Sequence, residues 1–283
     1  MTETNIQKSI VAVLAHPDDE SFGMGGTLAL YAQRGYKVSL ICATLGEAGT
    51  VDAHFLEGYG SIAELREAEL RCAIQHLGLS ELVLLGYRDS GMPGSADNSH
   101  PDAHINQPIE QVAQKVADHL RRLKADIVMT FDPIGGYRHP DHIHIHEATK
   151  LAFGFCADPA YKGSNQLPHQ PSRLYYHTIP RGFLRFAVGL IRLFGGDPTR
   201  WGRNKDIDLA SLANVEFPTH VEIDYSSLSH VKTSASACHA SQGGSQMRKG
   251  FIGFIFRMLG EKDTFMQAYP AIADNAARKY SLD

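Results

Sequence analysis

The amino-acid sequence predicts an α/β protein built on a mostly parallel sheet with helices on both faces. Two observations predict this class. Continuous apolar runs of strand length alternate with amphipathic runs of helix length through the first half of the chain, and the strand runs lack the polar alternation of half-exposed strands. The composition, with 43% hydrophobic and 20% charged residues, excludes disorder.

The elements of the first half follow one another in a regular order. The expected strands are short apolar runs at residues 9–15, 37–43, 82–85 and 126–131. The expected helices lie between and after them, at residues 25–34, 61–77, 107–123 and 141–155. The second helix has the clearest bounds, because Ser61 and Glu64 form a capping box and Gly78 follows its last residue. This order predicts βαβ units, in which ligands bind beyond the carboxyl ends of the strands.

The composition changes after residue 157. A connection rich in Pro, Gly, Asn and Gln spans 158–170, and the elements expected beyond it are strands at 173–179 and 219–224 and a helix at 226–240. We therefore expect a Rossmann-like three-layer core over residues 1–157. A smaller C-terminal α+β portion over residues 158–283 is expected to pack on that core and shape the substrate pocket, within one continuous domain.

Charge and cysteine usage narrow the class of protein. Lys+Arg 27 against Asp+Glu 31 gives a net charge of −4, which argues against a nucleic-acid partner. The four cysteines lie far apart with no Cys-x-x-Cys pair, at positions 42, 72, 156 and 238. This spacing predicts neither a disulfide framework nor a zinc ribbon, and together with the absence of a recognisable secretion signal it favours the cytoplasm.

Two apolar stretches, 182–194 and 251–259, are too short to span a membrane, which takes about 20 apolar residues. Residues 182–194 are expected as a helix with Arg181, Arg185 and Arg192 on one face. Packing within the domain or against a second subunit is the favoured interpretation. A lid, a hydrophobic aglycone pocket and a peripheral membrane-surface helix are the alternatives.

Histidine is unusually frequent, with 15 residues. Two clusters that contain histidine directly follow expected strands. Residues 16–20 read His-Pro-Asp-Asp-Glu and residues 135–142 read Gly-Gly-Tyr-Arg-His-Pro-Asp-His. Acids crowded beside a histidine are costly unless a cation binds them. His16, Asp19 and His142 would supply two nitrogens and one oxygen, an arrangement typical of catalytic Zn²⁺ that also fits Fe²⁺. The alternative is that each cluster only caps a helix.

These motifs resemble those of the PIG-L/LmbE superfamily of zinc-dependent N-acetylglucosamine deacetylases. The resemblance extends to further segments at 44–47, 64–69, 85–92 and 239–242. It is closest to the mycothiol branch, which contains an N-acetylglucosaminyl-inositol deacetylase and a conjugate amidase. The resemblance covers residues 9 to about 150 well and is patchy afterwards.

The resemblance implies a zinc-dependent hydrolase that removes acetyl from an N-acetylglucosaminyl conjugate. The metal ligands it implies are His16, Asp19 and His142. The catalytic residues it implies are Asp18 as general base, Tyr137 as donor to the oxyanion, and His139, held by Asp141, as a protonated partner. The substrate-binding residues it implies are Arg66, Asp89, Glu47 and His239. The implied partner is a small N-acylated amino sugar, and a second copy of the chain is an open alternative.

Several alternatives stay open at this point. The enzyme could instead cleave a larger acyl group or a thiol-conjugate amide, act on lipid-linked N-acetylglucosamine, or hydrolyse an ester or phosphate. A binding module without catalysis is the rival class, but it would have no use for Asp18 beside its ligands. His146 stands four residues after His142, yet His142 alone is favoured as ligand. Residues 100–104, His-Pro-Asp-Ala-His, are expected as a flexible loop.

Overall fold

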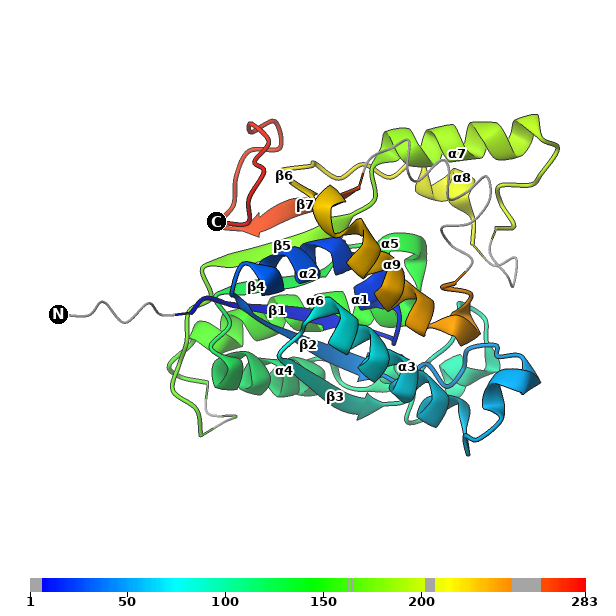
Figure 1. Cartoon of the computed structure of the whole chain (residues 1–283). Coiled ribbons are helices and arrows are strands. Elements are labelled where there is room, and N and C mark those ends of the chain that lie inside the picture. The colour runs from blue at the N-terminus through cyan, green and yellow to red at the C-terminus, as the bar shows by residue number, and fades with distance from the viewer. Residues whose placement is uncertain (1–6, 162, 164, 202–206, 246–260) are drawn as a thin grey trace.

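The computed structural model describes residues 7–161, 163, 165–201, 207–245 and 261–283, and their strands form one seven-stranded sheet (Figure 1). The order across the sheet is β3-β2-β1-β4-β5-β7-β6. The strands are β1 (Ser9–Leu14), β2 (Lys37–Thr44), β3 (Glu81–Tyr87), β4 (Ile127–Phe131), β5 (Arg173–Thr178), β6 (Val221–Asp224) and β7 (Lys262–Tyr269). The first five run parallel, while β7 is antiparallel to both of its neighbours. The predicted α/β class is confirmed.

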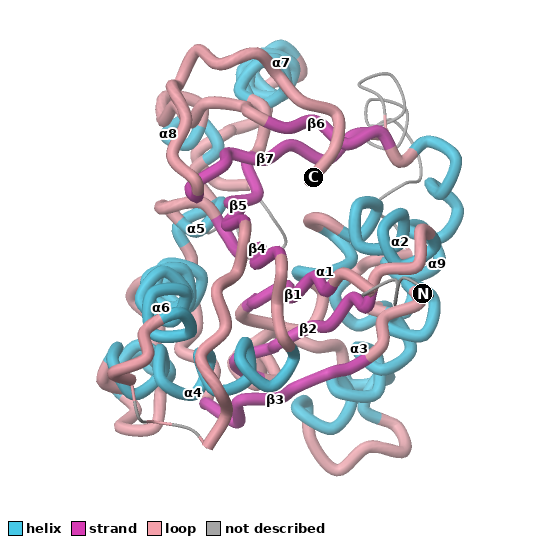
Figure 2. The backbone as a smooth tube through the Cα atoms, turned by 90° about the vertical axis from the view of Figure 1, so that its left-hand side faces the viewer, coloured by secondary structure: helices cyan, strands magenta, loops and turns pink. Residues whose placement is uncertain are grey.

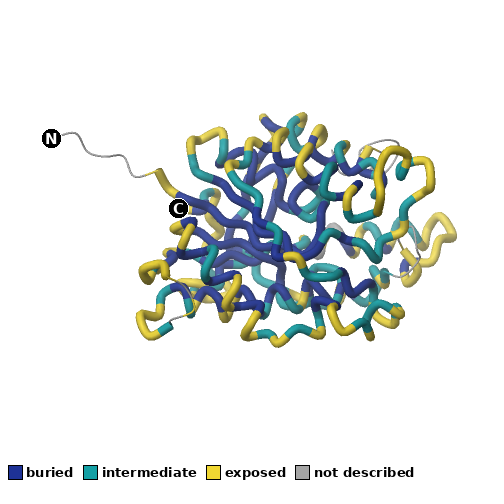
Figure 3. Tube along the Cα trace, turned by 90° about the horizontal axis from the view of Figure 1, so that it is seen from below, coloured by how far each residue is buried: buried dark blue, intermediate teal, exposed yellow. Residues whose placement is uncertain are grey.

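Helices cover both faces of the sheet (Figure 2). One face carries α2 (Gly25–Gln33), α3 (Ile62–Leu77) and α9 (Ser229–Cys238), and the other carries α4 (Ile109–Leu123) and α6 (Pro140–Ala157). The remaining helices are α1 (Asp19–Phe22), α5 (Gly135–Arg138), α7 (Arg181–Leu193) and α8 (Leu209–Leu212). The central strands are buried between these layers (Figure 3), as their continuous apolar runs predict.

The predicted start and stop of the second helix are confirmed in α3. The Ser61 hydroxyl accepts the Glu64 N–H at 3.1 Å, and Gly78 ends the helix with a φ of +72°. The Glu64 carboxylate accepts the N–H of Gly60 at 2.7 Å, one residue before its usual partner in a capping box. The helix is therefore fixed by the residues around it, which is why its bounds could be read from the sequence.

The second half adds to the same sheet instead of forming its own. β5 extends the parallel part, and β7 and β6 follow it as antiparallel strands. β7 was not among the expected strands, because its residues Lys-Asp-Thr-Phe-Met-Gln-Ala-Tyr mix polar and apolar types without a strict alternation. Its polar residues Asp263 and Thr264 are buried because they bond to Thr27 of α2 and Thr178 of β5. The buried Gln267 side chain donates to the Pro270 carbonyl, just after β7.

The expectation of unpaired cysteines is wrong at two positions. Cys72 of α3 and Cys238 of α9 form a disulfide, while Cys42 and Cys156 are free and buried. The pair is 166 residues apart in sequence, so only the packing of α9 against α3 reveals it. The compartment stays a prediction, without the support that unpaired cysteines gave it.

The helix expected at 182–194 is α7, and one of its faces packs within the chain. Leu184 and Val188 are buried against α8 and against Tyr137 of the segment that follows β4. Its opposite side leaves Phe186 and Leu193 exposed. Among the helices of the described residues, none combines the length and the apolar character needed to cross a bilayer. The apolar stretch at 251–259 lies outside the described residues.

Candidate metal centre and active site

The candidate site lies at the carboxyl ends of β1 and β4, which are neighbours in the sheet. β2 and β3 extend the sheet to one side of this pair and β5 to the other, so the strand order reverses there. Such a switch point opens a crevice for ligands in open α/β sheets. The segment after β1, residues 15–20, and the segment after β4, residues 132–142, meet in it. We call them the β1 loop and the β4 loop.

The three expected metal ligands converge. His16 Nδ1 lies 3.1 Å from His142 Nε2 and 3.6 Å from Asp19 Oδ2, and His142 Nε2 lies 3.3 Å from Asp19 Oδ1. A tetrahedral Zn²⁺ with ligands at about 2.0–2.1 Å has ligand atoms separated by about 3.4 Å. The separation of His16 and His142 is therefore close to that of two ligands of one tetrahedral ion, and each has an Asp19 oxygen within 3.6 Å. His139 offers a further ring nitrogen within 4.8 Å of both histidines.

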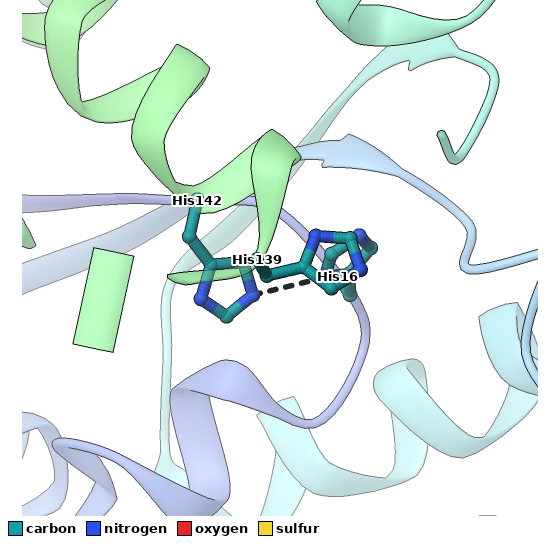
Figure 4. Close-up of side chains that lie close together, drawn as sticks. All are labelled: His16, His139 and His142. Carbon is teal, nitrogen blue, oxygen red and sulfur yellow. Dashed lines mark hydrogen bonds between the residues drawn. The ribbon is translucent and has the colours of Figure 1, made fainter. Parts of the chain in front are cut away.

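The hydrogen bonds of the two ligand histidines also favour a cation between them (Figure 4). His142 Nδ1–H donates to the Gly135 carbonyl at 3.2 Å, and His16 Nε2–H donates to Asp141 Oδ2 at 3.1 Å. In the neutral rings, the two nitrogens that face each other then carry only lone pairs. A divalent metal between the two nitrogens would accept both lone pairs, and without an ion a proton on His16 lets the same nitrogens form the hydrogen bond drawn in Figure 4.

Carboxylates around His16 make the site attractive to positive charge. Although burial lowers it, the neighbouring carboxylates Asp89, Asp141 and Asp19 together raise the pKa of His16 well above its usual range. Burial lowers the pKa of His142 to about 4 against the opposing effect of Asp19. Despite burial, His142 and His16 hold the pKa of the Asp19 carboxyl below its usual range. Asp19 is therefore ionised and His142 is neutral, whereas His16 favours its protonated form and would release this proton on binding a metal ion.

The β4 loop is organised by its own residues. Asp132 Oδ1 accepts the N–H groups of Ile134 at 3.1 Å and Gly136 at 2.8 Å. Gly135 has a φ of +64°, and a Cβ there would lie 2.6 Å from the Cβ of His142. Only glycine allows this approach, which brings the Gly135 carbonyl to the His142 ring. Asp132 was not singled out from the sequence, although its position directly after a buried strand was a usable signal.

Asp18, the expected general base, is held in an unusual conformation. Its φ is +114°, a region that residues other than glycine rarely adopt. Arg66 of α3 donates to Asp18 Oδ2 at 2.9 Å, to the Pro17 carbonyl at 2.5 Å and to the Gly46 carbonyl at 2.9 Å. Burial raises the pKa of the Asp18 carboxyl to about 7, against the lowering effect of Arg66. Arg66 thus fixes both the backbone and the carboxylate of this residue.

Behind Asp18 lies a buried polar group that the sequence analysis did not assign. Glu20 Oε2 accepts the Asp18 N–H at 3.0 Å, and Glu20 Oε1 accepts the His239 Nε2–H at 2.7 Å. Glu20 and His239 are both 0% exposed. His239 was expected to bind substrate, but it faces Glu20 and presents no surface to a ligand. The acid at position 20 was visible in the first motif, whereas its partner lies 219 residues away.

The partner expected for Asp141 was incorrect. Its carboxylate contacts His16, not His139, and it also accepts the N–H of Ser90 at 2.9 Å and the Ser90 hydroxyl proton at 2.5 Å. Towards His139, Asp141 offers only its backbone N–H, at 3.2 Å from Nδ1. The two residues are only two positions apart in sequence, but the helix start at Pro140 turns their side chains to different neighbours.

His139 and Tyr137 border the metal ligands. The His139 ring lies 4.5 Å from that of His16, and burial, with His16 and His142, holds the pKa of His139 well below its usual range. Since Nδ1 accepts the Asp141 N–H, the neutral ring carries its proton on Nε2. The expected protonated partner is therefore a neutral donor in this structure. Burial raises the pKa of the Tyr137 phenol, so it too keeps its proton.

The expected sugar-binding residues are largely engaged with the protein. The Asp89 carboxylate accepts the N–H groups of Gly91 at 2.8 Å and Ala48 at 3.2 Å, and it lies 3.4 Å from His16. Glu47 accepts the Asp89 N–H at 3.2 Å and lines a polar cavity of about 440 Å³. Of the four expected sugar-binding residues, Glu47 is the one that both lines this cavity and bonds to the backbone of Asp89.

Two further histidine expectations can be compared with the structure. His146 Nδ1–H donates to the Phe131 carbonyl at 2.7 Å, so its ring is turned away from the metal ligands. His104 lies in the segment expected as a flexible loop, yet it is fully buried and its Nδ1 is 3.4 Å from Asp141 Oδ1. No expected strand precedes His104, so no pattern in the sequence indicated that it would reach the site.

Comparison with known proteins gives consistent results. Residues 11–153 match the family model PIG-L, described as GlcNAc-PI de-N-acetylase. Over 247 residues the chain is 34% identical to 1D-myo-inositol 2-acetamido-2-deoxy-α-D-glucopyranoside deacetylase 2 of Catenulispora acidiphila, which covers 83% of this chain and 80% of that protein. This likeness extends beyond the two motifs into the second half of the chain.

Solved structures share the fold. N,N'-diacetylchitobiose deacetylase from Pyrococcus horikoshii matches with a TM-score of 0.63 and 20% identity, covering 93% of this chain and 84% of that chain. The 4-carboxy-2-hydroxymuconate hydratase from Pseudomonas putida matches with a TM-score of 0.59 and 20% identity, covering 96% of this chain and 100% of that chain. At this identity the likeness shows the fold alone, and the reaction has to be argued from the site.

Proposed function

The chain belongs to the PIG-L family, and from this premise we propose that it is a metal-dependent N-deacetylase of an N-acetylglucosaminyl conjugate. The observation that carries the proposal is the meeting of the β1 and β4 loops. It brings His16, Asp19 and His142 within reach of one ion and places the Asp18 carboxylate in the same loop as two of them.

We propose Zn²⁺ as the ion, with His16, Asp19 and His142 as its ligands, because two nitrogens, one oxygen and an open position suit a catalytic zinc. When bound, Zn²⁺ supplies Lewis-acid chemistry, which lowers the pKa of water and polarises an acyl oxygen. Fe²⁺ accepts the same donors, and measurement of the metal content after expression in medium with defined metals decides between them.

The chain's own groups account for the proton transfers of amide hydrolysis. Asp18 takes the proton of the attacking water, and this proton is then available to the nitrogen as the C–N bond breaks. The products are acetate and the free amine. His139 Nε2–H and the Tyr137 hydroxyl are the donors we assign to the oxygen of the tetrahedral intermediate, since both keep their protons at neutral pH.

For the sugar we propose an N-acetylglucosaminyl inositol, as the name of the Catenulispora acidiphila relative suggests. Glu47 is the residue we assign to a substrate hydroxyl, because it accepts the Asp89 N–H and also lines a polar cavity with Arg88 and Lys115. Arg66 and Asp89 would contribute through the loops they hold. The conjugate amidase and the lipid-linked deacetylase are the competing substrate classes, and the assay below separates them.

The test measures acetate and free amine released from N-acetylglucosaminyl inositol, free N-acetylglucosamine, a longer N-acyl analogue and a lipid-linked N-acetylglucosamine. We expect the inositol glycoside to be cleaved fastest. Asp18→Asn should lose about 10²–10⁴-fold in kcat while keeping its metal, and Asp274→Asn, at an exposed position, is the matched control. If the metal-loaded wild type releases no amine from any of the four, the deacetylase proposal fails.

A further inference from the structure

The Cys72–Cys238 disulfide joins two helices that both lead to the catalytic loop. α3 carries Cys72 and also Arg66, which holds the Asp18 carboxylate. α9 ends at Cys238, and His239 is the next residue along the chain. The disulfide therefore fixes the end of α9 to the helix that already supports Asp18 from its other side.

From His239 a line of buried hydrogen bonds leads to the backbone of Asp18. His239 donates to one oxygen of Glu20, and the other oxygen of Glu20 accepts the Asp18 N–H. With a φ of +114°, Asp18 keeps its conformation only where the surroundings hold it. The Glu20 carboxylate supports this backbone at the Asp18 N–H, and Arg66 supports it at the Pro17 carbonyl. The Asp18 carbonyl also accepts the N–H groups of Ser21 and Phe22 at the start of α1.

A second contact ties the same segment to α3. Ser241 donates its N–H and its hydroxyl proton to the Glu69 carboxylate, at 2.8 and 2.7 Å. Glu69 lies three residues from both Arg66 and Cys72, so the three side chains follow one side of α3. The segment after α9 is thus attached to α3 by a covalent bond at Cys238 and by hydrogen bonds at Ser241.

Resting on the deacetylase function proposed above, we propose that the Cys72–Cys238 disulfide is a redox-sensitive clamp. Its reduction releases the end of α9, loosens the His239–Glu20 support of Asp18 and slows catalysis. Glu20 and His239 are positioning residues in this scheme, because they act on the reaction only through Asp18.

The reductant is a dithiol. One of its thiolates attacks a disulfide sulfur and the S–S bond breaks, and its second thiolate then displaces the mixed disulfide. Two electrons pass to the protein, two protons complete the Cys72 and Cys238 thiols, and the dithiol becomes a cyclic disulfide. Cys238 is only half-buried, and the exposed His76 lies within 4.8 Å of the sulfurs, so the bond is reachable from solvent.

The test compares oxidised wild type with wild type that has been reduced by a dithiol and desalted without oxygen. We expect kcat for deacetylation to fall about tenfold on reduction, while KM and the metal content stay the same. Cys72→Ser and Cys238→Ser should each show the reduced-state kcat under both conditions. Cys156→Ser, at a free cysteine, is the matched control and should keep the response. Equal kcat values for oxidised and reduced wild type overturn the clamp.

Two further measurements separate positioning from a general loss of structure. His239→Ala should have about a tenth of the kcat of oxidised wild type and should no longer respond to reduction. His239→Gln, which keeps an N–H near the position of Nε2, should recover most of the oxidised-state kcat. Binding of a second metal per chain on reduction would assign Cys72, Cys238 and His76 to a metal site and overturn the clamp.

Amide hydrogen exchange gives a readout that does not depend on activity. Reduction should speed exchange in residues 18–20 and 238–242 and leave α6 unchanged, and no change in the first two segments overturns the inference. If the wild type is inactive on every substrate, the proposed function fails, whereas the exchange measurement still tests whether the disulfide holds the β1 loop.

Discussion

The two loops that meet at the site are held in different ways. The β4 loop is fastened largely to itself, since Asp132 binds the backbone of residues 134 and 136 and the Gly135 carbonyl binds His142. The β1 loop is held by residues that are far from it in the sequence. Arg66 holds it from 48 residues away, and His239, acting through Glu20, holds it from 219 residues away.

The conformation of the β4 loop thus depends on residues close together in the sequence, whereas that of the β1 loop depends on residues far apart. The geometry of the β4 loop is encoded within about ten consecutive residues, so substitutions elsewhere should leave it intact. The β1 loop takes its shape only after α3 and α9 have packed together, which makes Asp18 sensitive to changes far from it in the chain. Distant substitutions should therefore affect the position of the general base Asp18 more than they affect metal binding by His142.

The largest effect is expected from the removal of a metal ligand, because the β1 loop and the β4 loop bind the same ion. His16→Ala or His142→Ala should abolish stoichiometric zinc binding and with it nearly all deacetylation, since two ligands cannot hold the ion tightly. His146→Gln is the matched control, because His146 faces the Phe131 carbonyl and should leave the metal content at that of wild type. Metal analysis after dialysis measures this, and zinc retained by His142→Ala would contradict the ligand set.

The second largest effect is expected from Arg66→Lys, which tests whether α3 holds the β1 loop in place. Arg66→Lys should lower kcat about 10- to 100-fold with KM unchanged, because lysine cannot span Asp18 and the carbonyls of Pro17 and Gly46 together. Arg71→Lys on the exposed side of α3 controls for the charge and the helix. A rise in KM with kcat unchanged would instead give Arg66 the sugar-binding role expected from the sequence.

The same contrast explains what could be read from the sequence. The order of strands and helices, both histidine motifs and the capped start of α3 were predictable, because each rests on residues close together in the chain. The disulfide, the His239–Glu20 bond and the Asp141–His16 bond were not, since they join residues 125 or more positions apart. β7 was missed because the partners of its buried Asp263 and Thr264 lie on α2 and β5, far away in the chain.

Alanine substitutions at Gly135 and Gly136 should have smaller effects, and they test how the β4 loop positions His142. Gly135 and Gly136 both have positive φ, but only at Gly135 would a Cβ meet the His142 backbone and Cβ. Gly136→Ala should cost about 1–3 kcal/mol of unfolding free energy, because a φ of +67° with a ψ of −71° is a strained conformation for a residue with a Cβ. Gly135→Ala should add a further loss of about tenfold in zinc affinity. Isothermal titration with zinc and thermal unfolding measure the two effects, and equal zinc affinities for the two variants would contradict the steric account.

The smallest effect concerns the carboxyl that organises the β4 loop. Burial raises the pKa of Asp132 to about 6, although the Gly136 and Ile134 N–H groups lower it. The folded state therefore binds this proton more tightly than the unfolded chain, whose Asp pKa is about 3.9. Stability from this group is present below pH 4 and is lost as the pH rises towards and past 6.

Asp132→Asn isolates this contribution from the other titrating groups. Both N–H bonds go to the single oxygen Oδ1, so the asparagine amide oxygen can accept both while the side chain no longer ionises. Relative to wild type, the unfolding free energy of Asp132→Asn should therefore rise between pH 4 and 7, as followed by urea denaturation at saturating zinc. A constant difference across this range would mean that the β4 loop does not depend on the charge state of Asp132, and its order would then have to come from the glycines and the metal alone.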